Sequence, residues 1–127
     1  MKNPYQEAVN QYRSIELQTR IETASAHELT HLLMQGARSH ISTAQGYIER
    51  KQITEKGEHI GKAISIIEGL RTSLDHEQGG EIAVNLDRLY DYIQQILLKA
   101  NLDNDILLLL EANKLLAEIH EAWQGIK

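Results

Sequence analysis

The stretch from Gly79 to Asn101 constrains the fold most, because it reads as a chain break followed by one long amphipathic helix. Gly79 and Gly80 form a pair that tolerates positive φ and ends the preceding segment. Apolar side chains then recur at three- and four-residue steps on one helix face: Ile82, Leu86, Leu89, Tyr90, Ile93, Ile96, Leu97 and Ala100. Asparagine tolerates the left-handed conformation, so Asn101 is expected to end the helix. Such a helix requires partners along its apolar face.

The composition favours a single all-helical domain. The chain has 127 residues, 42% of them hydrophobic, with one proline and no cysteine. This length supports one domain with one sizeable core. Without cysteine the chain has no disulfide, thiolate zinc site or cysteine nucleophile, which fits a reducing compartment.

Charge and hydropathy exclude several classes of partner. The net charge is −5, with both signs mixed along the chain, whereas nucleic acid or anionic membrane requires a basic footprint. The longest wholly apolar run, Ile106 to Leu110, is far too short to span a bilayer. The N-terminus has no apolar signal core, so we expect a cytoplasmic protein with no membrane insertion.

The periodicity predicts four long helices and one short one, hence an antiparallel up-down four-helix bundle over residues 1–127. The long helices are expected at about residues 25–48, 54–74, 80–101 and 104–124. Ser25 and Glu28 form a capping box at the first of them. Thr54 is the expected cap of the second, and Asp103 or Asn104 that of the last.

Residues 1–16 are predicted to form an additional short N-terminal helix. Tyr5, Val9 and Tyr12 make a narrow apolar stripe on it. A helix this short is not stable alone, so it must dock on the bundle or fray. Residues 17–24 are expected to form an extended linker, because apolar and polar residues alternate from Ile15 to Ile21.

Two of the long helices have apolar or small residues over a wider part of their surface than one helix–helix contact in a bundle requires. The helix at 25–48 has a wide apolar arc, with Met34, Ile41 and Ile48 along one edge at seven-residue spacing. The helix at 54–74 carries a row of small residues four apart: Gly57, Gly61, Ser65, Gly69 and Ser73. Each interior glycine costs about 1 kcal/mol relative to alanine, so the row indicates close approach of another backbone. That backbone is either a neighbouring helix of this chain or a partner segment in a shallow trough.

The run His27-Glu28-Leu29-Thr30-His31 matches the zinc-peptidase pattern H-E-x-x-H. We interpret it as a coincidence for three reasons. Glu28 is already used by the capping box, the motif lies in a fraying first turn, and a catalytic zinc needs a third ligand and an open cleft. We therefore expect no catalytic residue, no metal and no cofactor.

The start of the last helix is apolar nearly all round, from Ile106 to Leu110. Either a further element of the chain covers it, which we favour, or it is an interaction patch. The N-terminal helix is the element that needs such a docking place.

Several motifs together resemble the FliS family, flagellar export chaperones that bind flagellin. The resemblance covers nearly the whole chain and rests on these segments: Tyr5 and Tyr12, Thr23-Ala24-Ser25, Glu28-Leu29-Thr30, Gly36-Ala37, Leu74-Asp75, Gly79-Gly80-Glu81-Ile82-Ala83, Asn85-Leu86, Leu89-Tyr90-Asp91-Tyr92 and Ala100-Asn101. The chain departs from the family pattern at Ser25-Ala26, where many members have Ser-Pro, and at Met34-Gln35, where many have Tyr-Asp.

The resemblance implies a cytoplasmic helical bundle without catalysis in a flagellated bacterium. Its implied partner is the C-terminal segment of flagellin, which is disordered before export and polymerises afterwards. Binding it prevents premature polymerisation and keeps the subunit competent for flagellar type III export. The export gate is a further candidate partner, and the free protein is expected to be a monomer or a weak dimer. In the family, the N-terminal segment covers part of the apolar binding surface and yields to flagellin.

The residues and the resemblance together suggest where flagellin binds. We expect a trough between the helices at 25–48 and 54–74, with Met34, Ile41 and Ile48 as one wall. Its floor or margin is formed by the three glycines Gly57, Gly61 and Gly69. Its displaceable cover is the N-terminal stripe of Tyr5, Val9 and Tyr12. The apolar face of the Gly79–Asn101 helix is expected to be used fully by the core.

Two other functions remain as alternatives. The surplus apolar surface could serve self-association of the bundle. The second alternative is a minimal zinc peptidase built on His27, Glu28 and His31, which metal analysis of the purified protein would test.

Overall fold

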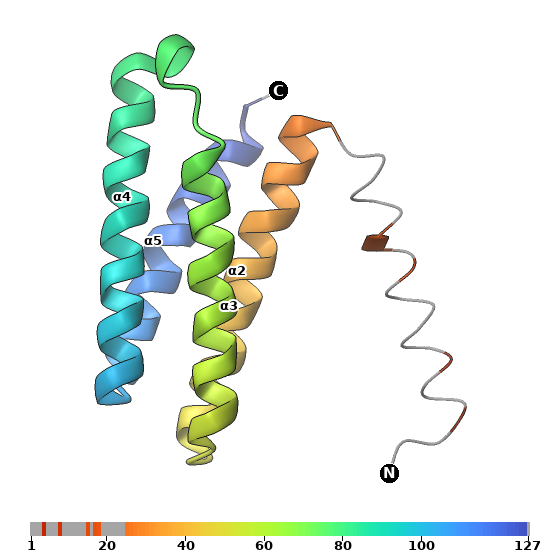
Figure 1. The fold of residues 1–127 in the computed structure, drawn as a ribbon, viewed down its shortest axis with the longest axis vertical. Helices are drawn as coiled ribbons and strands as arrows, with labels where there is room; N and C mark the ends of the chain where they lie inside the picture. Colours follow the sequence, from red (N-terminus) through yellow and green to blue (C-terminus); the bar gives the residue numbers. More distant parts are fainter. Residues whose placement is uncertain (1–3, 5–7, 9–14, 16, 19–24, 127) are drawn as a thin grey trace.

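The computed structural model describes residues 4, 8, 15, 17, 18 and 25–126. The continuous part forms four helices that run alternately up and down: α2 (Ala26–Glu49), α3 (Ile53–Thr72), α4 (His76–Asp103) and α5 (Ile106–Gln124) (Figure 1). Helix α2 packs against α3 and α5, and α4 packs against the same two helices. The predicted all-α bundle is confirmed.

One hydrophobic core runs between the helices. Its largest fully buried side chains are Met34, Ile41, Ile60, Ile67, Leu70, Ile93, Leu97, Leu109 and Leu116. They recur at steps of three, four or seven residues on each helix, which is the pattern that makes each inward face apolar. Tyr90 is also buried, at 2% exposure, and burial raises the pKa of its hydroxyl to about 12.

The capping residue predicted for the first long helix is confirmed, and the one predicted for the second is wrong. The Glu28 backbone N–H donates to Ser25 Oγ at 3.2 Å, so Ser25 caps α2 as predicted. Helix α3 begins at Ile53 after Gln52, which makes no side-chain cap, so the prediction of Thr54 as the cap is wrong.

The turn between α4 and α5 lies later than predicted. Asn101 is inside α4, and Asn104 takes the left-handed conformation instead, with φ 51° and ψ 43°. Asp105 caps α5, because its carboxylate accepts from the N–H groups of Leu107 and Leu108, so the prediction of Asp103 or Asn104 as this cap is wrong. An asparagine in the left-handed conformation does end α4, as predicted, but it is Asn104 and lies three residues after the predicted Asn101.

The predicted break at the glycine pair is confirmed at Gly80, which has φ 50° and ψ −126° inside the residues of α4. A short first turn precedes it, capped by the Asp75 carboxylate, which accepts from the Gln78 N–H. The long part of α4 therefore starts after a sharp change of direction (top of Figure 1).

The N-terminal predictions fall mostly outside the described residues. The apolar stripe of Tyr5, Val9 and Tyr12 lies there. Leu17 and Gln18 are described and are helical, which differs from the extended linker expected at these two positions. Within the part of the chain that the structure describes, no helix has the length and apolar character needed to cross a bilayer.

Candidate binding cleft

An apolar cleft of about 730 Å³ opens at one end of the bundle. It lies where α2 and α4 begin and where α3 and α5 end, at the top of Figure 1. All four helices contribute large apolar side chains to its lining, among them Met34, Leu70, Ile82, Leu89, Ile119 and Trp123.

Helix α4 contributes the most exposed part of this lining. Ile82 is 72% exposed and Leu89 is 40% exposed, although both share a face with the buried Ile93 and Leu97. The apolar face of α4 is therefore used by the core only along its later turns. Our expectation that the core uses this face completely is wrong, because the bundle leaves the cleft open beside the first turns of α4 after Gly80.

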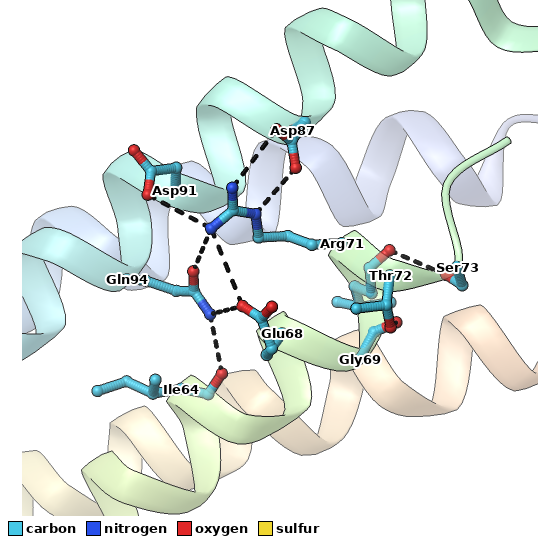
Figure 2. Close-up of polar contacts among 10 residues, drawn as sticks. Ile64, Glu68, Gly69, Arg71, Thr72, Ser73, Asp87, Asp91 and Gln94 are labelled. Atoms are coloured by element: carbon cyan, nitrogen blue, oxygen red, sulfur yellow. Dashed lines mark hydrogen bonds and ion pairs between the residues drawn. The ribbon is translucent and has the colours of Figure 1, made fainter. Parts of the chain in front are cut away.

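The wall between α3 and α4 is held by charged groups (Figure 2). Arg71 of α3 donates from Nε to Asp87 Oδ1 at 2.9 Å and from Nη1 to Asp91 Oδ1 at 3.3 Å. The hydrogen bond from Arg71, followed by its charge, lowers the pKa of the Asp87 carboxyl. The same hydrogen bond raises the pKa of Arg71, so both groups stay ionised at neutral pH.

Gln94 completes this wall from α4. Its side-chain carbonyl accepts from Arg71 Nη1 at 2.9 Å, and its amide donates to Ile64 O at 3.2 Å and to Glu68 Oε2 at 3.0 Å. Gln94 is only 7% exposed, and all three bonds join its side chain to residues of α3 across the α3–α4 seam (Figure 2).

The wall between α2 and α5 is held by aromatic rings instead. Trp123 Nε1 donates to His27 O at 3.0 Å, and His27 Nε2 donates to Trp123 O at 3.1 Å. The two rings stack at 4.8 Å with an interplanar angle of 16°. Trp123 is thus fixed at both its ring and its backbone while its side chain lines the cleft.

A second ring contact lies further along the same seam. His120 Nε2 lies 2.7 Å from His31 Nδ1, and Arg38 Nη1 lies 3.0 Å from His120 Nδ1. His120 is 4% exposed, and burial, followed by the charges of His31 and Arg38, lowers its pKa. Both histidines of the H-E-x-x-H match therefore pack on α5.

This placement gives no support to the zinc interpretation. His27 and His31 each bond a group of α5, and Glu28 is exposed. Over residues 25–126 and the few described before them, no three His, Cys, Asp or Glu side chains gather to hold a metal ion.

The seam between α2 and α3 is closed by direct packing. His40 Nδ1 and His59 Nδ1 lie 2.9 Å apart, and Tyr47 stacks on His59. A Cβ on Gly36 would lie 3.7 Å from Ile66 of α3. This seam therefore leaves no room for the trough that we expected between these two helices.

The glycine row of α3 faces away from α2. A Cβ on Gly57 would lie 3.8 Å from the Asn101 side chain of α4, and among the described residues no neighbouring element lies within 4 Å of a Cβ on Gly61 or Gly69. The row is thus not a tight helix crossing. It begins on the α4 side and continues onto an exposed surface.

The predicted apolar wall is largely core. Met34 and Ile41 are each 1% exposed, and Ile48 is partly buried against the core. The reason is that α2 packs against both α3 and α5, so its wide apolar arc is covered from two sides. Of the three residues, only Met34 lines the cleft.

Other exposed apolar side chains lie at the opposite end of the bundle. Leu102 is 82% exposed and Leu107 is 75% exposed, beside the turn that joins α4 and α5. The described residues bury Leu109 but leave Leu107 and Leu110 exposed, so a further cover over this start of α5 remains a prediction.

Comparison with known proteins identifies the family. The sequence pattern of the family described as "Flagellar protein FliS" matches residues 8–127. The chain belongs to the FliS family. It is 49% identical over 119 residues to the flagellar secretion chaperone FliSB of Pseudomonas aeruginosa, covering 94% of each chain. It is 42% identical over 119 residues to the flagellar secretion chaperone FliS of Salmonella typhimurium, covering 93% of this chain and 88% of that one.

The match extends to distant bacteria. The flagellar secretion chaperone FliS of Bacillus subtilis is 31% identical over 107 residues, covering 84% of this chain and 79% of that one. The protein is therefore a flagellar secretion chaperone of the FliS family, and the cleft is its candidate site for an export substrate.

Proposed function

We propose that this FliS-family protein binds the C-terminal segment of flagellin in the cytoplasm, with the cleft as the anchoring site. Binding keeps the disordered segment from polymerising and holds it competent for flagellar type III export, handed on at the export gate. The protein acts by binding alone and catalyses no reaction. The observation that supports this most is the apolar cleft, where large side chains are exposed on a well-packed bundle.

The size of the cleft limits what it holds. One turn of a helix with its side chains is a cylinder about 10–12 Å wide and about 5.4 Å long, or roughly 500 Å³. The cleft of about 730 Å³ therefore receives between one and two turns. An amphipathic helix that folds on binding presents apolar anchors at such spacing. The rest of the flagellin segment must lie on other surfaces, and the exposed glycine row of Gly57, Gly61 and Gly69 remains one proposal.

The test compares two leucines of α4 that are both exposed. Leu89 lines the cleft, whereas Leu102 lies at the opposite end of the bundle. Leu89→Asp should weaken binding of a flagellin C-terminal peptide at least tenfold, because binding would bury the carboxylate among apolar groups. Leu102→Asp should leave the affinity within about twofold. Isothermal titration calorimetry measures both.

Equal affinities for the two variants would show that the cleft is not the site. If neither the wild type nor the variants bind the peptide, flagellin is not the substrate. Circular dichroism confirms that each variant is folded.

The N-terminal cover is tested separately. If Tyr5, Val9 and Tyr12 form a displaceable cover, deletion of residues 1–16 should tighten peptide binding or leave it unchanged. A large loss of affinity would instead show that these residues contact flagellin.

Self-association is the second candidate use of the apolar surface, and the exposed Leu102 and Leu107 favour it. Sedimentation over a range of concentrations separates the two functions. A dimer that Leu102→Asp abolishes would support self-association at that end, and a monomer throughout would exclude it.

A further inference from the structure

The donors and acceptors between α2 and α5 fix the protonation of two histidines. Arginine only donates hydrogen bonds, so His120 Nδ1 must accept from Arg38 Nη1 at 3.0 Å. Neutral His120 then carries its hydrogen on Nε2 and donates it to His31 Nδ1 at 2.7 Å. His31 Nδ1 therefore accepts, as it also does from Gln124 Nε2 at 3.5 Å. This relay, Arg38 to His120 to His31, exists only while both imidazoles are neutral.

Adding a proton to either ring breaks the relay. A proton on His120 Nδ1 would face the N–H of Arg38, and a proton on His31 Nδ1 would face the N–H of His120. Each case places two donors opposite each other and adds positive charge beside the guanidinium. Arg38 Nε is already buried without a hydrogen-bond partner among the described residues, so the guanidinium depends on His120 for this contact with α5.

Among residues 25–126, no negatively charged side chain acts on His120 inside the seam. From α2, the groups that act on His120 are His31 and Arg38, both cationic when charged. From α4, Tyr92 reaches α5 but bonds Glu111. On α5 itself, Glu118 and Glu121 are exposed to solvent. Burial and these two neighbours accordingly lower the pKa of His120 from its usual 6.5.

The relay lies directly behind the cleft. Ile119 and Trp123, which flank His120 on α5, line it, and so do Thr30 and Met34, which flank His31 and its turn on α2. Separation of α2 from α5 at the relay would therefore move one complete wall of the cleft.

We propose that Arg38, His120 and His31 form a pH-sensitive latch that holds the α2–α5 wall of the cleft closed at neutral pH and releases it on acidification. The latch is a property of the fold and does not depend on which ligand the cleft binds.

The direction of the pH effect follows from the protonation states. The unfolded chain takes up a proton at His120 near pH 6.5, whereas the folded chain resists protonation of His120 until a lower pH. The contribution of the latch to stability is complete above pH 6.5 and is lost as the pH falls toward the lowered pKa. Each pKa unit of lowering corresponds to a fall in Tm of about 3–6 °C for a domain of this size.

The test uses the double variant His31→Gln/His120→Gln. Glutamine accepts and donates as neutral histidine does, but it has no proton to gain in this range. The wild type should lose Tm between pH 7.5 and 5.5, and the double variant should lose clearly less. The matched control is His76→Gln, because His76 is exposed at the start of α4, and it should behave like the wild type. Equal losses in the wild type and the double variant would overturn the latch.

Two measurements on the wild type keep the proposal testable if the double variant does not fold. Histidine side-chain NMR at pH 7.5 should show His120 as the Nε2–H tautomer and then titrate below 6.5; a titration at or above 6.5 would overturn the latch. Trp123 is the only tryptophan, so fluorescence quenching by acrylamide reports on this wall. Quenching should rise between pH 7.5 and 5.5, and constant quenching would show that the wall does not move.

Discussion

The two walls of the cleft are built from different chemistry. Between α3 and α4, Arg71 forms ion pairs with the carboxylates of Asp87 and Asp91. Between α2 and α5, the contacts are neutral imidazole rings and an indole. One cleft thus has a wall that salt and strong acid weaken and a wall that mild acid weakens.

The difference matters because carboxylates and imidazoles titrate in separate ranges. The Arg71–Asp87 ion pair is lost only as the pH falls below about 4. The α2–α5 wall, which contains His120, loses stability already below about pH 6.5. A ligand bound at the same site would therefore meet one rigid wall and one adjustable wall at mildly acidic pH. Substitutions in each wall are therefore expected to change stability in different pH ranges.

The largest expected effect comes from Trp123→Ala, which removes the main packing of the α2–α5 wall. We expect the free energy of unfolding to fall by about 3 kcal/mol, at the low end for buried aromatic residues because Trp123 is only partly buried. Urea unfolding followed by far-UV circular dichroism measures it. A loss below about 1 kcal/mol would show that the indole packs weakly and that the wall depends on its hydrogen bonds.

Gln94→Ala breaks the α3–α4 wall without removing a charge. Gln94 is 7% exposed and bonds Arg71, Ile64 and Glu68, so its loss removes three partly buried hydrogen bonds between α4 and α3. The expected cost is about 1–3 kcal/mol. Gln95→Ala, on the exposed neighbouring position of α4, should change stability by less than about 0.5 kcal/mol. Equal costs in urea unfolding would show that the Gln94 bonds contribute nothing specific.

Asp87→Asn should remove part of the acid sensitivity of the α3–α4 wall alone. Arg71 lowers the pKa of Asp87 below its usual 3.8, so this pair contributes stability above pH 3.8 that is lost as the pH falls through the lowered pKa. The variant should show a shallower fall of Tm below pH 4 and an unchanged fall between pH 7.5 and 5.5. A change confined to the higher range would mean that the two walls are not independent.

Gly69→Ala should have the smallest effect and the opposite sign. Within the described part of the chain no neighbouring element lies within 4 Å of the added Cβ, so the protein gains about 0.5–1 kcal/mol from the lower entropy of the unfolded chain. Thermal unfolding should show a higher Tm with the same pH dependence as the wild type. Destabilisation would reveal a contact of α3 at this position.

The fold was predictable because it depends on which residues share a helix face. The spacing of Ile93, Leu97 and Ala100 requires a packed neighbour, and short connections make that neighbour antiparallel. Helix ends were less predictable, since Asn101 and Asn104 both tolerate the left-handed conformation and only the tertiary turn selects Asn104.

The cleft was not predictable, because the spacing of apolar residues shows which side of a helix faces its neighbours. It does not show along how much of the helix those neighbours extend. Ile82 and Leu89 carry the same signal as Ile93, yet the bundle covers only the last. The prediction from the glycine row failed for the same reason, since none of the helices α2, α4 and α5 lies within 4 Å of a Cβ on Gly61 or Gly69.

Hydrogen exchange of the protein with and without the flagellin C-terminal segment tests the cleft as the binding site most directly. We predict new protection in residues 82–90 of α4 and 115–123 of α5, which line the cleft, and none in residues 98–110 at the opposite end. Protection at residues 98–110 with an unchanged cleft would contradict the account.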